Sequence, residues 1–442
     1  MRFQTASMTR CRSLSEPHDA GLSRMLIVYI ATGLFFMLIP GTLVGVANLL
    51  TISASHTPRA ADAGWVQAHG HAQIFGWLGT FILGIGYYAI PRLRLAAWSP
   101  FAAWTTYALW TAGVTMRWAV GTWPPDQWRV LFPLAGALEL LAVLVFCVSV
   151  FLARPRARDE KWRTSVVMIT AAGWGMFASI TIGAWMSFRV DAPLFPFDFN
   201  QRYLALITWG FVVPFVWGFA TRWLPPLLGL RRTRKPWLLP SLVLLFAGVV
   251  AALAGALLLA SLVFLASSVA FVVALRLWEP SEREPKLRGV HESTPLFLRI
   301  AFVWLAIAAL LAIVSAALPL PNGWAGASRH ALTVGFFAVV VFSIGPRVLP
   351  AFFGVRRLWS ARLMAAVLVL VNIGCTLRVV SQVLAYEGLS AIAWQALPLS
   401  AVIEMTAVAL FALNMMMTLT TGSPLAAFLE AQQQQQGDAL SR

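Results

Sequence analysis

Long apolar stretches of about 20 residues recur from one end of this 442-residue chain to the other. A helical run of that length spans the hydrocarbon core of a bilayer. Inside lipid every backbone N–H and C=O must be paired within the protein, so such runs predict helices rather than open sheets. The composition agrees, since 59% of the residues are hydrophobic and only 11% are charged. The sequence therefore predicts an all-α protein that is surrounded by a lipid bilayer.

Twelve transmembrane helices are predicted from these stretches. The apolar run over 237–277 is too long for one helix, and we divide it at Gly255 into a tight hairpin of two short spans. The predicted spans are 25–51, 66–90, 97–118, 130–153, 164–188, 202–228, 237–255, 257–277, 296–318, 328–352, 361–385 and 391–420.

The formal net charge of +16 raises nucleic acid as a partner, but the arginines gather in alternate loops, as the orientation of a membrane protein requires. We therefore expect no nucleic-acid partner. The basic loops follow the even-numbered spans, which places both termini in the cytoplasm. Residues 1–24 form a basic cytoplasmic tail, 25–421 a single membrane domain, and 422–442 a glutamine-rich cytoplasmic tail that is predicted to be disordered.

A stretch in the second predicted span occurs three times in the chain. It reads WVQAHGHAQIFGWLGTFILGIGYYAIPRL over 65–93, and degenerate copies read ALITWGFVVPFVWGFATRWLP from Ala205 and HALTVGFFAVVVFSIGPRVLP from His330. The outer copies carry histidine where the middle copy has Ala205. Their position near the start of even-numbered spans places His69, His71 and His330 near the outer face of the membrane.

Residues in the neighbouring spans repeat at similar offsets. Arg117 and Arg378 lie 261 residues apart, Glu139 and Glu404 lie 265 apart, and His71 and His330 lie 259 apart. The matching places in the middle copy are Ala252 and a position near Ser261. The chain is thus predicted to contain three four-helix repeats, over about 25–153, 164–277 and 296–420, of which only the outer two keep a His–Arg–Glu set.

This four-plus-four-plus-four plan resembles the catalytic subunit of haem-copper oxidases, and HGHAQIFGWLGTFILGIGYYAIPR is similar to the second span of that family. The resemblance implies a pseudo-threefold ring of helix quartets, with a low-spin haem held between the second and tenth spans. On this chain those positions are His71 and His330. A binuclear oxygen- or nitric-oxide-reducing centre would need further histidines on the sixth and seventh spans, which contain none, so enzymatic activity stays open.

A narrower likeness is to the NnrS family of bacterial membrane proteins. It is carried by His69 and His71 at the start of the second span, by Arg222–Trp223–Leu224–Pro225 at the end of the sixth, and by HALTVG from His330. The resemblance implies a bacterial cytoplasmic (inner) membrane protein with haem b and a role in the nitric oxide response or denitrification. The resemblance also allows copper as a second metal and nitric oxide as a ligand.

Two imidazoles at matched depths suit the two axial positions of one haem iron. His69 points to another side of its helix than His71, so it is either a ligand of a second metal site or an interfacial residue. Arg117 and Arg378 either pair with haem propionates or form ion pairs with Glu139 and Glu404. The alternative functions are a cofactor-free transporter or scaffold, and a haem-based sensor or carrier that exchanges electrons with quinol.

Overall fold

The computed structural model describes residues 16–94, 99–152, 163–287, 289–319, 322–353, 355 and 358–421. Residues 1–15 of the predicted basic tail and all of the predicted tail 422–442 lie outside the described residues. The first helix begins at Glu16 rather than near residue 25. A helix that its apolar residues already hold in place extends into adjoining polar residues at little cost, which explains the earlier start.

The described residues are helical apart from short connections and contain no strand. Three rods, which we call the inner rods, are each built from two α-helices joined end to end by a π-helical segment. They consist of α4 (Ala63–His71), η3 (Ala72–Gly79) and α5 (Thr80–Arg94); of α9 (Phe197–Ala205), η5 (Leu206–Val212) and α10 (Val213–Leu228); and of α14 (Gly323–His330), η6 (Ala331–Ala338) and α15 (Val339–Phe352).

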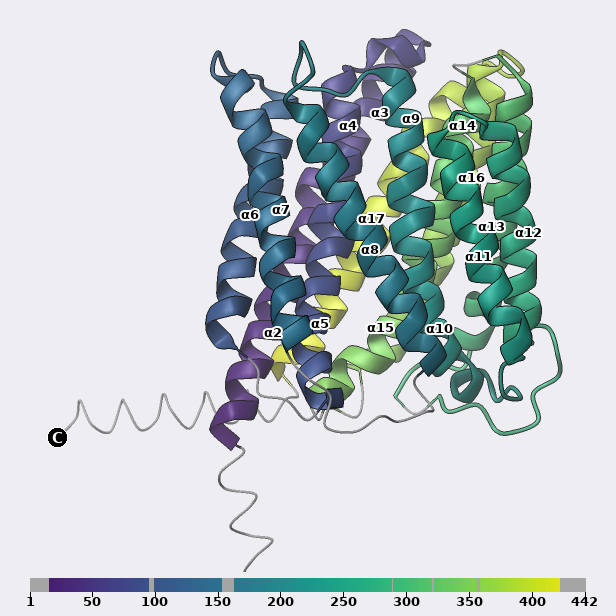
Figure 1. Cartoon of the computed structure of the whole chain (residues 1–442). Coiled ribbons are helices and arrows are strands. Elements are labelled where there is room, and N and C mark those ends of the chain that lie inside the picture. The colour runs from purple at the N-terminus through teal and green to yellow at the C-terminus, as the bar shows by residue number, and fades with distance from the viewer. Residues whose placement is uncertain are drawn as a thin grey trace, which may run out of the picture.

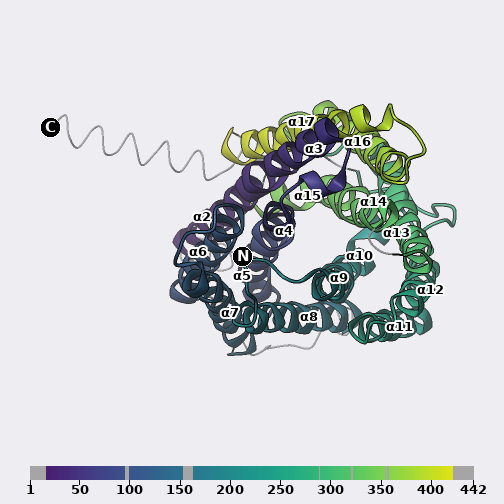
Figure 2. The ribbon, with the colours of Figure 1, turned by 90° about the horizontal axis from the view of Figure 1, so that it is seen from above.

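The remaining helices surround the inner rods (Figures 1 and 2). They are α2 (Glu16–Phe36), η1 (Met37–Leu43), α3 (Val44–Ser55), α6 (Pro100–Thr122), α7 (Trp128–Leu152), α8 (Arg163–Ser187), α11 (Lys235–Leu253), α12 (Leu257–Leu275), α13 (Thr294–Ala317), α16 (Ala361–Tyr386) and α17 (Ala393–Thr421), with the 3₁₀ turn η2 (Pro58–Ala60) in one loop.

Ten helical stretches of the described chain are long and apolar enough to cross a membrane. Helices lie in all the predicted spans. The ten stretches, which concern only the described residues, do not include the inner rod 63–94 or α6. The predicted division at Gly255 is confirmed: α11 ends at Leu253, α12 begins at Leu257, and Gly255 adopts φ +87° in the turn between them.

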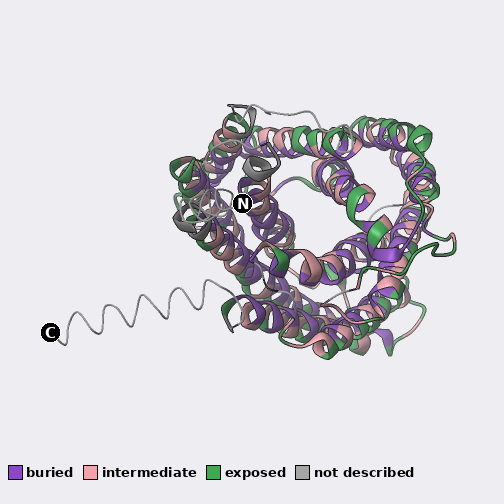
Figure 3. Cartoon of the chain, turned by 90° about the horizontal axis from the view of Figure 1, so that it is seen from below, coloured by how far each residue is buried: buried purple, intermediate pink, exposed green. Residues whose placement is uncertain are grey.

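The burial of each residue depends on whether it faces the inside or the outside of the ring of helices. Viewed from below, exposed residues lie along the outer surface of the helices and buried residues face the interior (Figure 3). The exposed positions on α11 and α12 are large and apolar, among them Val243, Val250, Leu259 and Val269. An apolar outer surface of this kind suits contact with lipid chains rather than with water.

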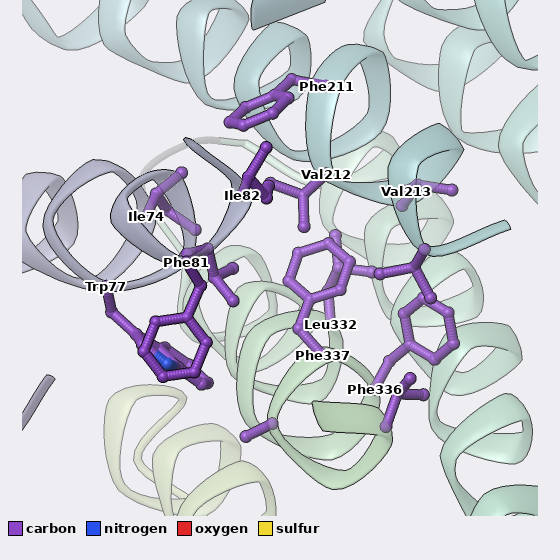
Figure 4. Close-up of a cluster of buried hydrophobic side chains, with 14 of the residues drawn as sticks. Ile74, Trp77, Phe81, Ile82, Phe211, Val212, Val213, Leu332, Phe336 and Phe337 are labelled. Carbon is purple, nitrogen blue, oxygen red and sulfur yellow. The ribbon is translucent and has the colours of Figure 1, made fainter. Parts of the chain in front are cut away.

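The three inner rods meet in an aromatic core (Figure 4). Phe211 of η5 stacks on Phe75 of η3 with ring centroids 6.4 Å apart, and Trp77 of η3 lies 6.1 Å from Phe342 of α15. Side chains of η3 thus pack on those of η5 and of α15. This core fixes the depth of each rod relative to the other two.

The π-helical segments begin at corresponding residues. η3, η5 and η6 each start directly after His71, Ala205 and His330, the positions that the sequence comparison aligned. A π-helical segment inserts an extra residue into a helical turn and is frequent at functional sites. The three aligned positions therefore occupy the same structural place in the three inner rods.

A glycine follows each of these positions five residues later. An added Cβ would meet Phe36 at Gly76, Leu206 at Gly210 and Trp304 at Gly335, the closest approach being 2.5 Å at Gly335. Two outer-helix aromatic rings thus pack directly on the backbone of the inner rods at the first and last of these glycines. The close approach holds the rods against their surrounding helices.

Candidate functional site

The three predicted histidines lie on two short helices, α4 and α14, that begin the first and third inner rods. The start of α4 is fixed by Asp62, whose carboxylate accepts from the backbone N–H of Gly64 at 2.8 Å and of Trp65 at 3.1 Å. The start of α14 is fixed in the same way by Asn322, whose amide oxygen accepts from the N–H of Ala325 at 3.0 Å. These N-caps set which face of each helix presents its histidine.

His69 points from α4 toward the π-helical segment of the first helix. Its Nδ1 lies 2.8 Å from the carbonyl oxygen of Gly41, and a Cβ at Gly45 would lie only 2.8 Å from its Cε1. A carbonyl oxygen can only accept a hydrogen bond, so Nδ1 carries the proton and the neutral ring keeps its lone pair on Nε2. No described residue hydrogen-bonds that Nε2.

His330 has the same arrangement on α14. Its Nδ1 lies 2.9 Å from the carbonyl oxygen of Gly326, one turn earlier, which again leaves the lone pair on Nε2. His69 lies within electrostatic reach of His330, and Arg378 lies within reach of both rings. Arg329, beside His330, belongs to the same group. We call His69, His330, Arg329 and Arg378 the His69–His330 cluster.

Arg378 is buried, with 5% of its surface exposed, and is incompletely paired. Its Nε and Nη1 have no acceptor among the described residues, although Tyr386 is a hydrogen-bond partner of the side chain. The nearby Glu404 is also left with an unpaired Oε1, and no ion pair within 4.0 Å joins it to Arg378. Unpaired charged groups in a membrane interior are expensive and mark functional sites. The buried guanidinium is therefore suited to an anionic group between the rods.

Arg329 is tied to the middle inner rod. Its Nη1 donates to Oε1 of Gln201 on α9 at 2.7 Å. The bond links the third inner rod to the second and holds the arginine beside His330. Arg329 was not predicted from the sequence, although its position next to the predicted ligand His330 was a usable signal.

His71 lies on the opposite side of α4 from His69, because two residues along a helix correspond to a rotation of about 200°. Its Nε2 lies 2.9 Å from Oε1 of Glu139 on α7, and the two side chains are 11% and 5% exposed. Arg117 and Tyr203 lie within electrostatic reach of Glu139. We call these four residues the His71–Glu139 cluster. The predicted site residues thus divide between two clusters, one on each side of α4.

The first and third quartets pack their glutamates identically. A Cβ at Gly113 would lie 2.8 Å from Cγ of Glu139, and a Cβ at Gly374 would lie 2.7 Å from Cγ of Glu404. Each glycine is four residues before the arginine of its set. In both quartets the glutamate therefore lies against the backbone of the preceding helix.

The middle quartet places an aromatic ring at the corresponding position. A Cβ at Gly248 would lie 2.7 Å from the ring of Phe264, which stacks on Trp209 with ring centroids 4.4 Å apart. Phe264, rather than the predicted position near Ser261, thus occupies the place of the glutamates. The short hairpin at Gly255 removes part of the loop, so counting residues along the chain misjudged the offset by three.

Among the described residues no group of three or more His, Cys, Asp and Glu side chains could hold a metal ion. Two imidazoles with free Nε2 atoms and a buried arginine fit a metal that brings its own equatorial ligands, as a haem does.

Comparison with known proteins identifies the family. The family model described as "NnrS protein" matches residues 27–422, which is most of the chain. The chain belongs to the NnrS family. The match spans both histidine clusters and all three inner rods of this NnrS protein.

A solved structure has a similar fold. The NnrS chain is similar to a chain described in "Cryo-EM structure of a heme-copper terminal oxidase dimer provides insights into its catalytic mechanism", with a TM-score of 0.56 and 11% sequence identity. The similarity covers 90% of this chain and 84% of that chain. The predicted haem-copper-oxidase-like arrangement of the helices is thus confirmed at the level of the fold. No curated protein sequence matches the chain.

Proposed function

We propose that this NnrS protein is a b-type haem protein of a bacterial inner membrane, with twelve spans in three repeats and both termini in the cytoplasm. It would hold one low-spin haem between the first and third inner rods and act in the nitric oxide response or in denitrification. The single observation that carries the haem proposal is the pair of histidines whose Nδ1 atoms are engaged by carbonyl oxygens and whose Nε2 atoms are free. This is the usual state of imidazoles that bind a metal.

The pairing that the geometry favours is His69 with His330. The sequence comparison paired His71 with His330, since these two residues align in the repeats. His71, however, has its Nε2 on Glu139 and faces the other side of α4. We therefore assign His69 as the partner of His330 and leave His71 outside the haem site.

The arginines complete the proposed haem site. Arg378 and Arg329 lie close to His330, and the unpaired Nε and Nη1 of Arg378 suit a carboxylate such as a haem propionate. Open space adjoins α4 at Gly70, where an added Cβ would meet nothing within 4 Å. When bound, a bis-imidazole haem supplies one-electron transfer rather than an open position for a gas. His69 and His330 would hold it, and Arg378 would orient it.

An absorption spectrum of the purified protein tests this proposal. We expect a low-spin haem spectrum from the wild-type protein, and its loss in His69→Ala and in His330→Ala. His71→Ala is the matched control, because it removes an imidazole from the same helix, and it should keep the spectrum. A colourless wild-type protein after expression with ample haem would favour a cofactor-free transporter or scaffold. Loss in His71→Ala but not in His69→Ala would restore the pairing of His71 with His330.

A further inference from the structure

We propose that the His71–Glu139 cluster is a second ligand site, separate from the haem, that binds a small planar anion with two oxygen atoms, of the carboxylate or nitrite class. The cluster lies between α4, α6, α7 and α9, on the side of α4 away from His69. It does not depend on the presence of haem. The proposal rests on two donors that the protein leaves without an acceptor, Arg117 and Tyr203.

Arg117 is packed on aromatic rings instead of on an acceptor. Its Cζ lies 3.6 Å from the ring centroid of Phe132 and 4.3 Å from that of Phe195. No described residue accepts a hydrogen bond from the guanidinium, and no ion pair within 4.0 Å joins it to Glu139. Ring faces attract the cation but leave the N–H groups at its edge free to donate. The planar edge of a guanidinium matches an anion with two oxygen atoms.

Tyr203 brings a second donor to the same place. Its side chain is 7% exposed and packs edge-on against Phe195 with ring centroids 5.3 Å apart, so it shares an aromatic neighbour with Arg117. Its hydroxyl has no hydrogen-bond partner among the described residues. A Cβ at Gly183 of α8 would lie 2.7 Å from that hydroxyl oxygen, so the glycine leaves it room. The hydroxyl is thus free to donate to a bound oxygen atom.

The charge of the cluster favours an anion. His71 and Glu139 engage each other at 2.9 Å, and no described carboxylate lies within 4.0 Å of the guanidinium of Arg117. Arg117 is always charged, so its positive charge lies in the helix bundle without a carboxylate in contact. A bound monoanion neutralises it, whereas a neutral molecule of the same shape does not.

The outer loop before α9 covers the cluster. The side-chain amide of Gln67 binds the backbone of Phe195 twice, donating to its carbonyl oxygen and accepting from its N–H, both at 2.7 Å. The same Phe195 ring lies against Arg117. This places the cluster directly beneath the 188–196 loop, so a water-soluble anion would enter from that end of the bundle.

Titration calorimetry of the full-length protein in detergent tests the proposal, with formate and nitrite as probes and formamide as the neutral control. We expect both anions to bind at one site and formamide not to bind. Arg117→Gln should weaken binding roughly tenfold or more, and Tyr203→Phe roughly fivefold, as the loss of a charged and of a neutral hydrogen bond predicts. The matched control is Arg129→Gln, an exposed arginine that also lies over an aromatic ring, and it should leave binding unchanged.

Haem content, measured on the same samples, separates this proposal from the haem proposal. Anion binding by haem-free protein would support the second site even if the haem proposal fails. Haem loss in Arg117→Gln together with absent anion binding would mean that Arg117 serves a haem propionate, and would overturn the proposal. So would equal binding of formamide, or unchanged anion binding in both Arg117→Gln and Tyr203→Phe.

Discussion

The position of the His69 imidazole depends on the absence of a side chain at Gly45. The ring occupies the space that a side chain at Gly45 would fill, with its Cε1 2.8 Å from the position of an added Cβ. Its Nδ1 is then within reach of the Gly41 carbonyl oxygen. Gly45 on α3, which contributes no side chain to the site, thus sets the direction in which Nε2 of His69 points.

Substitution at Gly45 is therefore expected to disturb the proposed haem without changing a ligand. In Gly45→Ala the ring of His69 must move by several tenths of an ångström, because real side chains do not approach that closely. We expect a lower haem content or a broadened low-spin spectrum. Gly173→Ala on α8 is the control, since its added Cβ would meet nothing within 4 Å, and it should match the wild type. An unaltered spectrum in Gly45→Ala would argue against His69 as a ligand.

Some residues of the candidate site could be identified from the sequence, and others could not. His330, Arg378 and Glu404 were found because they repeat earlier residues at matching offsets, and the structure places them close together. The choice between His69 and His71 was not accessible, because it depends on Gly41 and Glu139, which come from other helices. Sequence offsets give the depth of a side chain in the membrane but not the neighbour that it meets.

The middle predicted quartet, which includes α11, α12 and the inner rod 197–228, lacks the polar set of the other two. Where Glu139 lies against Gly113 and Glu404 against Gly374, Phe264 lies against Gly248 and stacks on Trp209 at an interplanar angle of 4°. Two turns further along α12, Phe271 stacks on Trp217 with centroids 4.1 Å apart. Aromatic packing thus replaces buried charge, and we infer that this quartet is structural.

Removing one of these rings is expected to lower stability but not haem content. Trp209→Ala should reduce the free energy of unfolding by about 3–5 kcal/mol, as the loss of a large buried ring does. Trp174→Ala is the control, since Trp174 is 68% exposed on α8. Thermal unfolding and the haem spectrum, measured together, check both parts. A lost spectrum at unchanged stability would contradict a structural role for the middle quartet.

The loop after α12 is tied to the start of α11 by Glu279. Its carboxylate accepts from Arg276 Nε at 2.6 Å and from Arg234 Nη2 at 2.8 Å. The hydrogen bond from Arg276, aided by the positive charge of both arginines, lowers the pKa of Glu279 from its usual value of 4.5. A carboxylate with a lowered pKa adds stability above the pKa of the unfolded state and loses it as the pH falls through the folded-state pKa.

We therefore expect Glu279→Gln to lower the unfolding temperature slightly at pH 7, and the difference from wild type to shrink as the pH falls below about 4.5. Glu284→Gln, an exposed carboxylate in the same loop, is the control and should behave as the wild type at every pH. Scanning calorimetry between pH 7 and pH 3.5 measures both. A difference that grows toward acid pH would mean that the pKa of Glu279 is raised rather than lowered.

The whole molecule is a ring of helices around three inner rods (Figure 2), and sequence predicted most of that plan. Hydropathy and the tight turn at Gly255 located the helices, and the repeat located the inner rods. The π-helical segments were not predicted, since their hydrogen-bond pattern has no compositional signature.

Orientation across the membrane is a prediction for the molecule as a whole. Asp191→Cys lies in the loop before α9 and Glu284→Cys in the basic loop after α12, at opposite ends of the bundle. In intact bacteria a membrane-impermeant maleimide should label the first variant, and it should label the second only after the membrane is opened. The cysteines of the wild-type chain set the background. Labelling of Glu284→Cys in intact cells would reverse the proposed orientation.

α4 carries His69 and His71 on opposite sides of one short, capped helix. The two imidazoles contact different walls of the bundle: His69 meets Gly41 of η1, and His71 meets Glu139 of α7. A ligand in one cluster that displaced α4 would therefore also displace the histidine of the other cluster. In that case each ligand would change the affinity for the other by the same factor, because coupling between two sites is reciprocal.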